Sequence, residues 1–155
     1  MDLSDLEVLK TAEVIADSVW QEITTWDSFA KDTVGKQLAK SVDSIGANIA
    51  EAFGRFHYAD KIRFFYYSRG SIFETKYWLN RCLNRGLLAK TNVQMHLSQL
   101  TILAKRLNSL TAETKSQITK SSGKSFKEEA SSYLIEEPEG LFSSLELEFL
   151  SKLDN

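Results

Sequence analysis

The first 137 residues of this chain contain no proline, and this feature constrains the fold more than any other. Proline breaks helices because it lacks an amide hydrogen and because its ring clashes with the preceding turn. The 155 residues also include only seven glycines. No stretch shows the sustained alternation of apolar and polar residues that a half-buried β-strand needs. The sequence therefore predicts long helices and an all-α fold.

Apolar residues recur at heptad spacing in four segments, which is the pattern of helices packed in a bundle. The expected helices run over about 4–26, 34–56, 60–86 and 92–120, with Asp27 to Asp32 as the first connection and Asp32 or Thr33 as the second helix's cap. The short turn from His57 to Asp60 makes the second and third helices antiparallel neighbours. We therefore expect an up-down-up-down antiparallel four-helix bundle over residues 1–120, followed by a C-terminal extension.

Residues 121–155 differ in composition and are expected to form a linker and an acidic amphipathic tail. Ser121 to Ser125 has the composition of a flexible linker, and Glu136 to Gly140 is an acidic helix breaker. A short amphipathic helix is predicted from Leu141, Phe142, Leu145, Phe149 and Leu153. Isolated helices shorter than ~12–15 residues are seldom stable in water. The tail is therefore expected to dock on its own bundle, on a neighbouring subunit or on a partner.

Ser44 to Arg55 carries a longer pattern, S-I-G-A-N-I-A-E-A-F-G-R, and R-G-S-x-x-E follows at Arg69 to Glu74. With Gln37-Leu38, Ser41 and Arg63-Phe64-Phe65, it resembles a family of bacterial four-helix-bundle proteins. That family, often labelled S23, was first noted as products of intervening sequences in 23S ribosomal RNA genes. The resemblance runs from about Leu6 to Leu110. Gly46 and Ala52 depart from the common pattern, which has proline and glycine there.

The resemblance implies a cyclic homo-oligomer, most simply a homopentamer. The family is similar in architecture to the pentameric accessory protein of diversity-generating retroelements, which partners a reverse transcriptase and nucleic acid. The leading hypothesis is therefore a non-enzymatic homo-oligomeric adaptor or scaffold associated with RNA or DNA. The alternative is a protein–protein interaction module that acts through the acidic tail or the bundle rim without nucleic acid. Apolar area for a subunit interface is expected from Trp20, Trp26, Tyr67, Tyr77 and Trp78.

Two sets of residues on the patterned helices are interpreted as packing features. Small residues spaced four apart predict a close approach of another helix. These are Gly46, Ala50 and Gly54, with Gly70 on the next helix. Polar residues on one face predict a buried hydrogen-bonded network that fixes helix register. These are Asn48, Glu51 and Arg55, with Glu74 on the next helix. A ligand or catalytic site between helices is the other interpretation of the polar set.

The net charge of −2 is unevenly distributed along the chain. Residues 1–35 have two lysines against eight acids, residues 36–127 have sixteen Lys/Arg against five acids, and residues 128–155 have one lysine against eight acids. The basic middle is either a nucleic-acid surface or is neutralised by the acidic ends within one bundle. Candidate contacts to nucleic acid are Lys36, Lys40, Lys61, Arg63, Lys76, Arg81, Arg85, Lys105 and Arg106.

The sequence contains no recognisable motif for binding a cofactor or a metal ion. Neither His57 nor His96 completes a Glu-x-x-His pair or a zinc spacing, so we expect His57 in a turn and His96 on a helix surface. Cys82 lies on the third helix's seam and is expected to be a small core residue. We expect no cofactor, no metal and no catalytic residue. With no signal peptide, no membrane span and a lone cysteine, the expected location is the cytoplasm.

Overall fold

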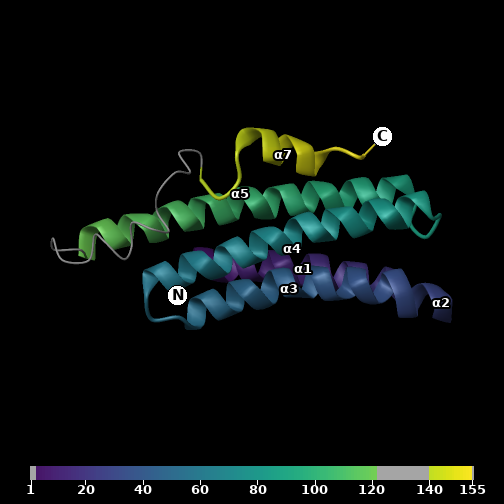
Figure 1. Ribbon diagram of the computed structural model, residues 1–155, viewed down its shortest axis with the longest axis horizontal. Coiled ribbons are helices and arrows are strands. Elements are labelled where there is room, and N and C mark those ends of the chain that lie inside the picture. Colours follow the sequence, from purple (N-terminus) through teal and green to yellow (C-terminus); the bar gives the residue numbers. More distant parts are fainter. Residues whose placement is uncertain (1–2, 122–139, 155) are drawn as a thin grey trace.

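The computed structural model describes residues 3–121 and 140–154. Within these ranges the regular structure is helical and includes no strand, so the all-α prediction is confirmed. The long helices α1 (Leu3–Ile23), α3 (Lys36–Gly54), α4 (Tyr58–Asn84) and α5 (Lys90–Ser121) lie side by side (Figure 1). Helix α3 packs against α1 and α4, and α5 packs against α4 and α1. The predicted linker at 122–139 lies outside the described residues.

The prediction of four helices was too simple, because shorter helical elements precede α3 and follow α5. The side chain of Asp27 accepts a hydrogen bond from the amide of Ala30 at 2.9 Å and begins α2 (Ser28–Ala30). Helical backbone then continues through a π-helical turn, η1 (Lys31–Gly35), directly into α3. The expected connection at Asp27 to Asp32 was therefore wrong, because the helix is capped at Asp27 and not at Asp32 or Thr33.

Among the glycines that the structure describes, Gly35 has the closest neighbours, and no sequence pattern singled it out. A Cβ atom on Gly35 would lie 3.0 Å from the carbonyl oxygen of Ala30 and 3.1 Å from Cγ2 of Ile23. Both distances are shorter than ordinary Cβ contacts, so a side chain at this buried position would make Ala30 or Ile23 shift. The end of α1 and the π-helical turn thereby pack tightly together.

The predicted close packing at Gly46, Ala50, Gly54 and Gly70 is not made within one chain. A Cβ on Gly46 would make only ordinary contact, 3.6 Å from Cβ of Ala12. A Cβ on Gly54 or Gly70 would meet nothing within 4 Å, and Ala50 is exposed. The reason is rotational: the buried seam of α3 runs through Ile45, Ile49 and Ala52, so Ala50 and Gly54 face away from it.

The core follows the predicted heptad seams. Helix α3 buries Leu38, Val42, Ile45, Ile49 and Ala52, and α4 buries Phe65, Ser68, Ile72, Thr75, Leu79 and Cys82. The buried hydroxyls have partners, since Ser68 donates to the carbonyl of Ile45 at 3.1 Å and Thr75 lies 3.1 Å from the hydroxyl of Ser41.

Cys82 is fully buried, which confirms it as a core residue. Burial is the largest cause that raises the pKa of its thiol to about 12.

Helix α5 continues past the expected end of its apolar seam at Leu110. Thr111, Thr114 and Ile118 are buried, so this last part of the helix still packs against the bundle. Among the helices of the described residues, none is long and apolar enough to cross a membrane.

Substituting Gly35 tests the tight contact at the π-helical turn. We expect Gly35→Ala to lower the free energy of unfolding by about 1–3 kcal/mol, because the added methyl group overpacks the site. Gly70→Ala is the matched control, since it adds the same methyl group to open space in a helix interior. It should raise the free energy of unfolding by about 0.5–1 kcal/mol. Urea unfolding measures both, and a destabilising Gly70→Ala would contradict this packing.

Candidate interaction site on α4 and α5

Helix α4 carries two parallel stripes of side chains. The first is the core seam, which includes Ser68, Ile72, Thr75 and Leu79. The second, called here the outer stripe, consists of the residues that follow each of these: Arg69, Phe73, Lys76 and Asn80. Steps of four, three and four residues align them along one side of the helix. The C-terminal segment, residues 140–154, covers this outer stripe; its helix α7 (Ser144–Ser151) packs along α5 on the side away from α1 and α3 (Figure 1).

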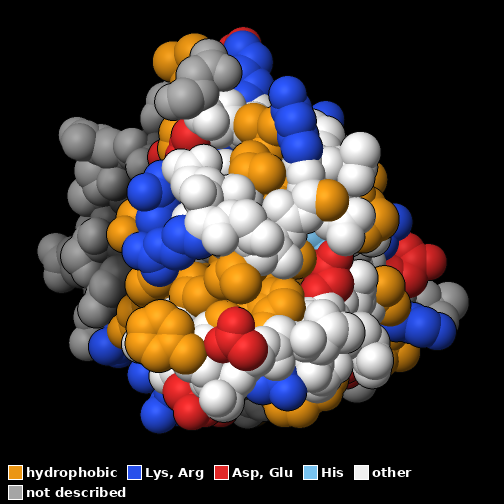
Figure 2. Space-filling view, turned by 90° about the vertical axis from the view of Figure 1, so that its right-hand side faces the viewer, with side chains coloured by type: hydrophobic (Ala, Val, Ile, Leu, Met, Phe, Trp, Pro, Cys, Tyr) orange, Lys and Arg blue, Asp and Glu red, His pale blue; other side chains and the backbone are white. Residues whose placement is uncertain are grey.

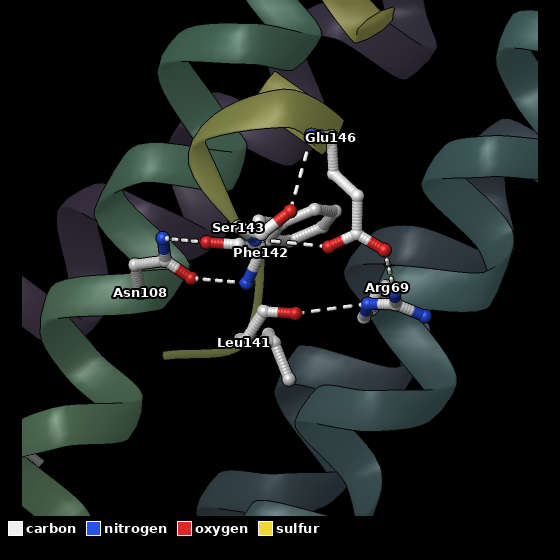
Figure 3. Close-up of polar contacts among 6 residues, drawn as sticks. All are labelled: Arg69, Asn108, Leu141, Phe142, Ser143 and Glu146. Carbon is white, nitrogen blue, oxygen red and sulfur yellow. Dashed lines mark hydrogen bonds and ion pairs between the residues drawn. The ribbon is translucent and has the colours of Figure 1, made fainter. Parts of the chain in front are cut away.

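Two residues hold the beginning of the C-terminal segment, Arg69 of α4 and Asn108 of α5 (Figure 3). The Nε of Arg69 donates to the carbonyl oxygen of Leu141 at 2.8 Å, and its guanidinium pairs with the carboxylate of Glu146. The amide of Asn108 on α5 donates to the carbonyl oxygen of Phe142 at 2.8 Å, and its oxygen accepts from the Phe142 amide at 2.6 Å. The backbone at Leu141 and Phe142 is therefore fixed on both sides.

Local sequence explains why α7 begins where it does. The hydroxyl of Ser143 accepts from the amide of Glu146 at 3.2 Å, and the Glu146 carboxylate accepts from the amide of Ser143 at 2.9 Å. This reciprocal capping box satisfies two free amides of the first turn. Glu146 therefore both caps α7 and pairs with Arg69, which couples the folding of the helix to its docking.

Lys76 holds the end of the C-terminal segment. Its side chain is only 2% exposed, and Nζ donates to the carbonyl oxygen of Lys152 at 2.6 Å and to the carboxylate of Asp154 at 2.9 Å. The amide of Asn80 donates to the other oxygen of that carboxylate at 3.0 Å. A lysine near the last carbonyl groups of a helix satisfies them and interacts favourably with its dipole. Because a buried ammonium is costly when unpaired, these acceptors are essential to its position.

Apolar contacts complete the docking and correct the predicted face of the tail. Leu141, Phe142 and Leu150 are buried, whereas Leu145 is 78% exposed and Phe149 is half exposed. The predicted apolar set is therefore confirmed for Leu141 and Phe142 and wrong for Leu145, because the two buried residues precede the helix and set which side of α7 faces the bundle. Burying a side chain of this size is worth about 1.5–3 kcal/mol. Of the three expected docking places, the described segment therefore occupies its own bundle.

Most predicted nucleic-acid contacts remain at the surface. Lys36, Lys40, Arg63, Arg85, Lys105 and Arg106 are exposed, and Lys61 and Arg81 are partly buried. Lys76 differs from them, because the C-terminal segment covers it and leaves it buried. Figure 2 shows one end of the molecule, where Lys and Arg side chains lie apart among acidic and hydrophobic ones. The cations do not form one continuous patch on that face.

The predicted buried network of Asn48, Glu51, Arg55 and Glu74 does not form within one chain. The Asn48 amide donates to the carbonyl of Ser44 at 2.8 Å, and Glu74 accepts from the Trp78 indole at 3.3 Å. Glu51 and Arg55 pair within α3, but both are exposed. Glu51 and Arg55 face outward for the same rotational reason as Ala50 and Gly54, whereas Asn48 is half-buried and Glu74 is exposed on α4.

His96 was expected on a helix surface, and that prediction was wrong. Its side chain is fully buried, and Nε2 lies 2.6 Å from the carboxylate of Glu22 on α1. Asn92 donates to the other oxygen of Glu22 at 2.7 Å, so the group ties the end of α1 to α5. No local pattern signals this group, because Glu22 and His96 are 74 residues apart in the chain.

His57 is exposed at the start of α4, as the turn prediction required. In the described ranges, no three His, Cys, Asp or Glu side chains are grouped to hold a metal ion.

Phe142→Ala tests the docked arrangement. Loss of this buried ring should weaken docking by about 3 kcal/mol, so amides of α7 should lose protection from hydrogen exchange while those of α4 keep theirs. Leu145→Ala is the matched control, because it truncates an exposed side chain of the same helix and should leave exchange unchanged. Protection of α7 that survives Phe142→Ala would contradict docking through this residue.

Comparison with known proteins gives a family match over the long helices. No curated protein matches the chain significantly. A family model described as 23S rRNA-intervening sequence protein matches residues 4–109, which extend from α1 through much of α5 and exclude the C-terminal segment. The match covers well over half of the chain. This protein belongs to the 23S rRNA-intervening sequence protein family.

Proposed function

We propose that this protein is a non-enzymatic, homo-oligomeric adaptor that associates with RNA through lysine and arginine side chains on its outer faces. The observation that carries the proposal is the family match over residues 4–109, since the family is described by intervening sequences of 23S rRNA. Eight of the nine predicted cationic contacts keep at least partly exposed side chains, which supports it. Exposed cations bind phosphate by displacing its counterions.

The proposed subunit is an up-down-up-down antiparallel bundle of α1, α3, α4 and α5. We place the subunit interface on the outer face of α3. There, Ala47, Ala50 and Gly54 line a shallow hollow together with the exposed Glu51–Arg55 pair. Small side chains let a second helix approach closely, and the ion pair supplies polar partners. These small and polar residues of α3, which are exposed in one chain, would then be buried between copies, most simply in a pentamer.

Oligomerisation gives this proposal its mechanism. A few separated cations on one subunit bind phosphate weakly, whereas a ring repeats them on every subunit and gains avidity.

The non-enzymatic part of the proposal rests on the chemistry of the titratable groups. The Glu22–His96 pair is closed off because His96 is fully buried, and the raised pKa of Cys82 keeps its thiol protonated.

A protein partner at the tail or the bundle rim is the alternative. The exposed side chains of Leu145 and Phe149 on α7 favour it, since they offer apolar surface beside acidic residues. Such a partner would either bind this outer face or displace the contacts that Arg69, Lys76 and Asn108 make. Capture of a partner by the intact protein without any RNA binding would favour this alternative.

Ala50→Glu tests the proposed subunit interface. Because Ala50 is exposed in the single chain, the substitution should leave helix content unchanged and convert the oligomer to smaller species. Ala112→Glu is the matched control, since Ala112 is exposed on α5. Light scattering coupled to size-exclusion chromatography measures the mass. An unchanged assembly for Ala50→Glu would place the interface elsewhere.

The association with RNA is tested by titration at several salt concentrations. Lys36→Gln/Lys40→Gln should reduce the slope of log affinity against log salt by about 0.9 for each duplex phosphate that the protein no longer neutralises. Lys31→Gln, at an exposed lysine outside the predicted set, should leave the slope unchanged. If the intact oligomer binds neither single-stranded nor duplex RNA at low salt, the proposal is wrong.

A further inference from the structure

The C-terminal segment occupies donors that belong to the family-matched part of the chain. Arg69, Lys76, Asn80 and Asn108 all lie within residues 4–109, whereas the segment that they bind lies beyond the matched range. Arg69 is moreover part of the R-G-S-x-x-E pattern noted in the sequence. An element outside the family match therefore covers cationic and amide groups inside it.

The chemistry of this contact resembles recognition of a nucleic-acid backbone. The donor groups of these side chains meet acceptor oxygens of the segment: the carboxylates of Glu146 and Asp154 and the carbonyl oxygens of Leu141, Phe142 and Lys152. The one donor that the segment offers them is the Phe142 amide, which donates to the side-chain oxygen of Asn108. Arginine and lysine bind phosphate oxygens as they bind carboxylates, and the arginine fork suits both groups.

Aromatic rings lie between the sites of Glu146 and Asp154, and they too resemble a nucleic-acid binding site. The ring of Phe73 lies between the cations of the outer stripe, with the Arg69 guanidinium 5.0 Å from its centroid. The rings of Phe142 and Phe149 pack on it, with centroids at 5.7 and 6.2 Å and the second pair stacked. Proteins that bind single-stranded nucleic acid combine cations along the backbone with aromatic rings that stack on bases. Phe73 offers such a ring once the segment leaves.

We propose that the outer stripe and Asn108 form a binding site for single-stranded RNA that the C-terminal segment covers. In it, Arg69 and Lys76 bind phosphates where Glu146 and Asp154 now lie, and Phe73 stacks on a base. RNA and the segment therefore compete for one site. This inference rests on the proposed function, because it names a site and a regulator for the same RNA association.

The C-terminal segment can leave its site and return to it. Helix α7 has only eight residues, which is too short for a stable helix without its docking contacts. Eighteen residues, 122–139, join it to α5, so it stays attached after release and can return. Its docked form therefore sets the RNA affinity of the intact chain.

Releasing the segment without changing charge tests the inference. Leu141→Ser/Phe142→Ser removes two buried apolar anchors in the full chain, and hydrogen exchange of α7 verifies the release. The affinity for a labelled single-stranded oligouridylate should rise at least fivefold at low salt. The log–log salt slope should steepen by about 1.4, since each single-strand phosphate contact contributes about 0.7. Leu145→Ser, at an exposed site of α7, should match the unaltered protein in both.

Further variants identify the groups that bind. Adding Arg69→Gln/Lys76→Gln to the released protein should return the salt slope to its original value. Adding Phe73→Ala should instead lower affinity at least fivefold with the slope unchanged, as removal of a stacking ring does. Glu146→Gln/Asp154→Asn removes the two carboxylate charges that pair with Arg69 and Lys76 without touching the apolar anchors. It serves as the second test, expected to shift affinity in the same direction, if the serine variant fails to fold.

Two outcomes would overturn the inference. If release is verified and RNA affinity and slope are unchanged, the segment covers no RNA site, although RNA binding by the intact chain would keep the proposed function. If neither the intact nor the released protein binds RNA, both are wrong, and the outer stripe is a surface for protein.

Discussion

Burial of α4 on two neighbouring stripes is the interaction on which the rest of the structure depends. Its core seam packs against α3 and α5, and its outer stripe receives the C-terminal segment. The two stripes differ by a single residue in register. The first is apolar or small and the second is charged, amide-bearing or aromatic. One helix thus forms the centre of the bundle and presents the donors that hold an element far along the chain, 77 residues from Arg69 to Glu146.

The heptad pattern predicted what each long helix buries, because apolar periodicity directly reports the buried side. Ile45, Leu79 and Cys82 lie where that pattern placed them. It did not predict the surroundings of Lys76 or His96, since their partners, Asp154 and Glu22, come from distant parts of the chain. The small residues of α3 predicted a close neighbour without its identity for a related reason: glycine at helical spacing shows that little space is filled, but not which helix lies on that side.

The candidate site was the least predictable part of the molecule. The predicted apolar set of the tail included Leu141 and Phe142, which are buried, and Leu145, which is exposed. The capping box at Ser143 starts the helix after the two buried residues, so Leu150 and not Leu145 is buried within α7. The charge pattern did hold useful information. The basic middle and the acidic C-terminal part meet at the pairs Arg69–Glu146 and Lys76–Asp154, while other cations face solvent. Acidic residues of the tail therefore neutralise some cations of the basic middle, and others remain at the surface.

Hydrogen exchange of residues 144–151 in the full chain, with and without single-stranded RNA, tests the central claim most directly. We expect these amides to be protected in the free protein and to exchange faster at saturating RNA. The core amides of α4 should stay protected throughout. Protection of 144–151 that is unchanged or increased at saturating RNA would contradict competition between the segment and RNA.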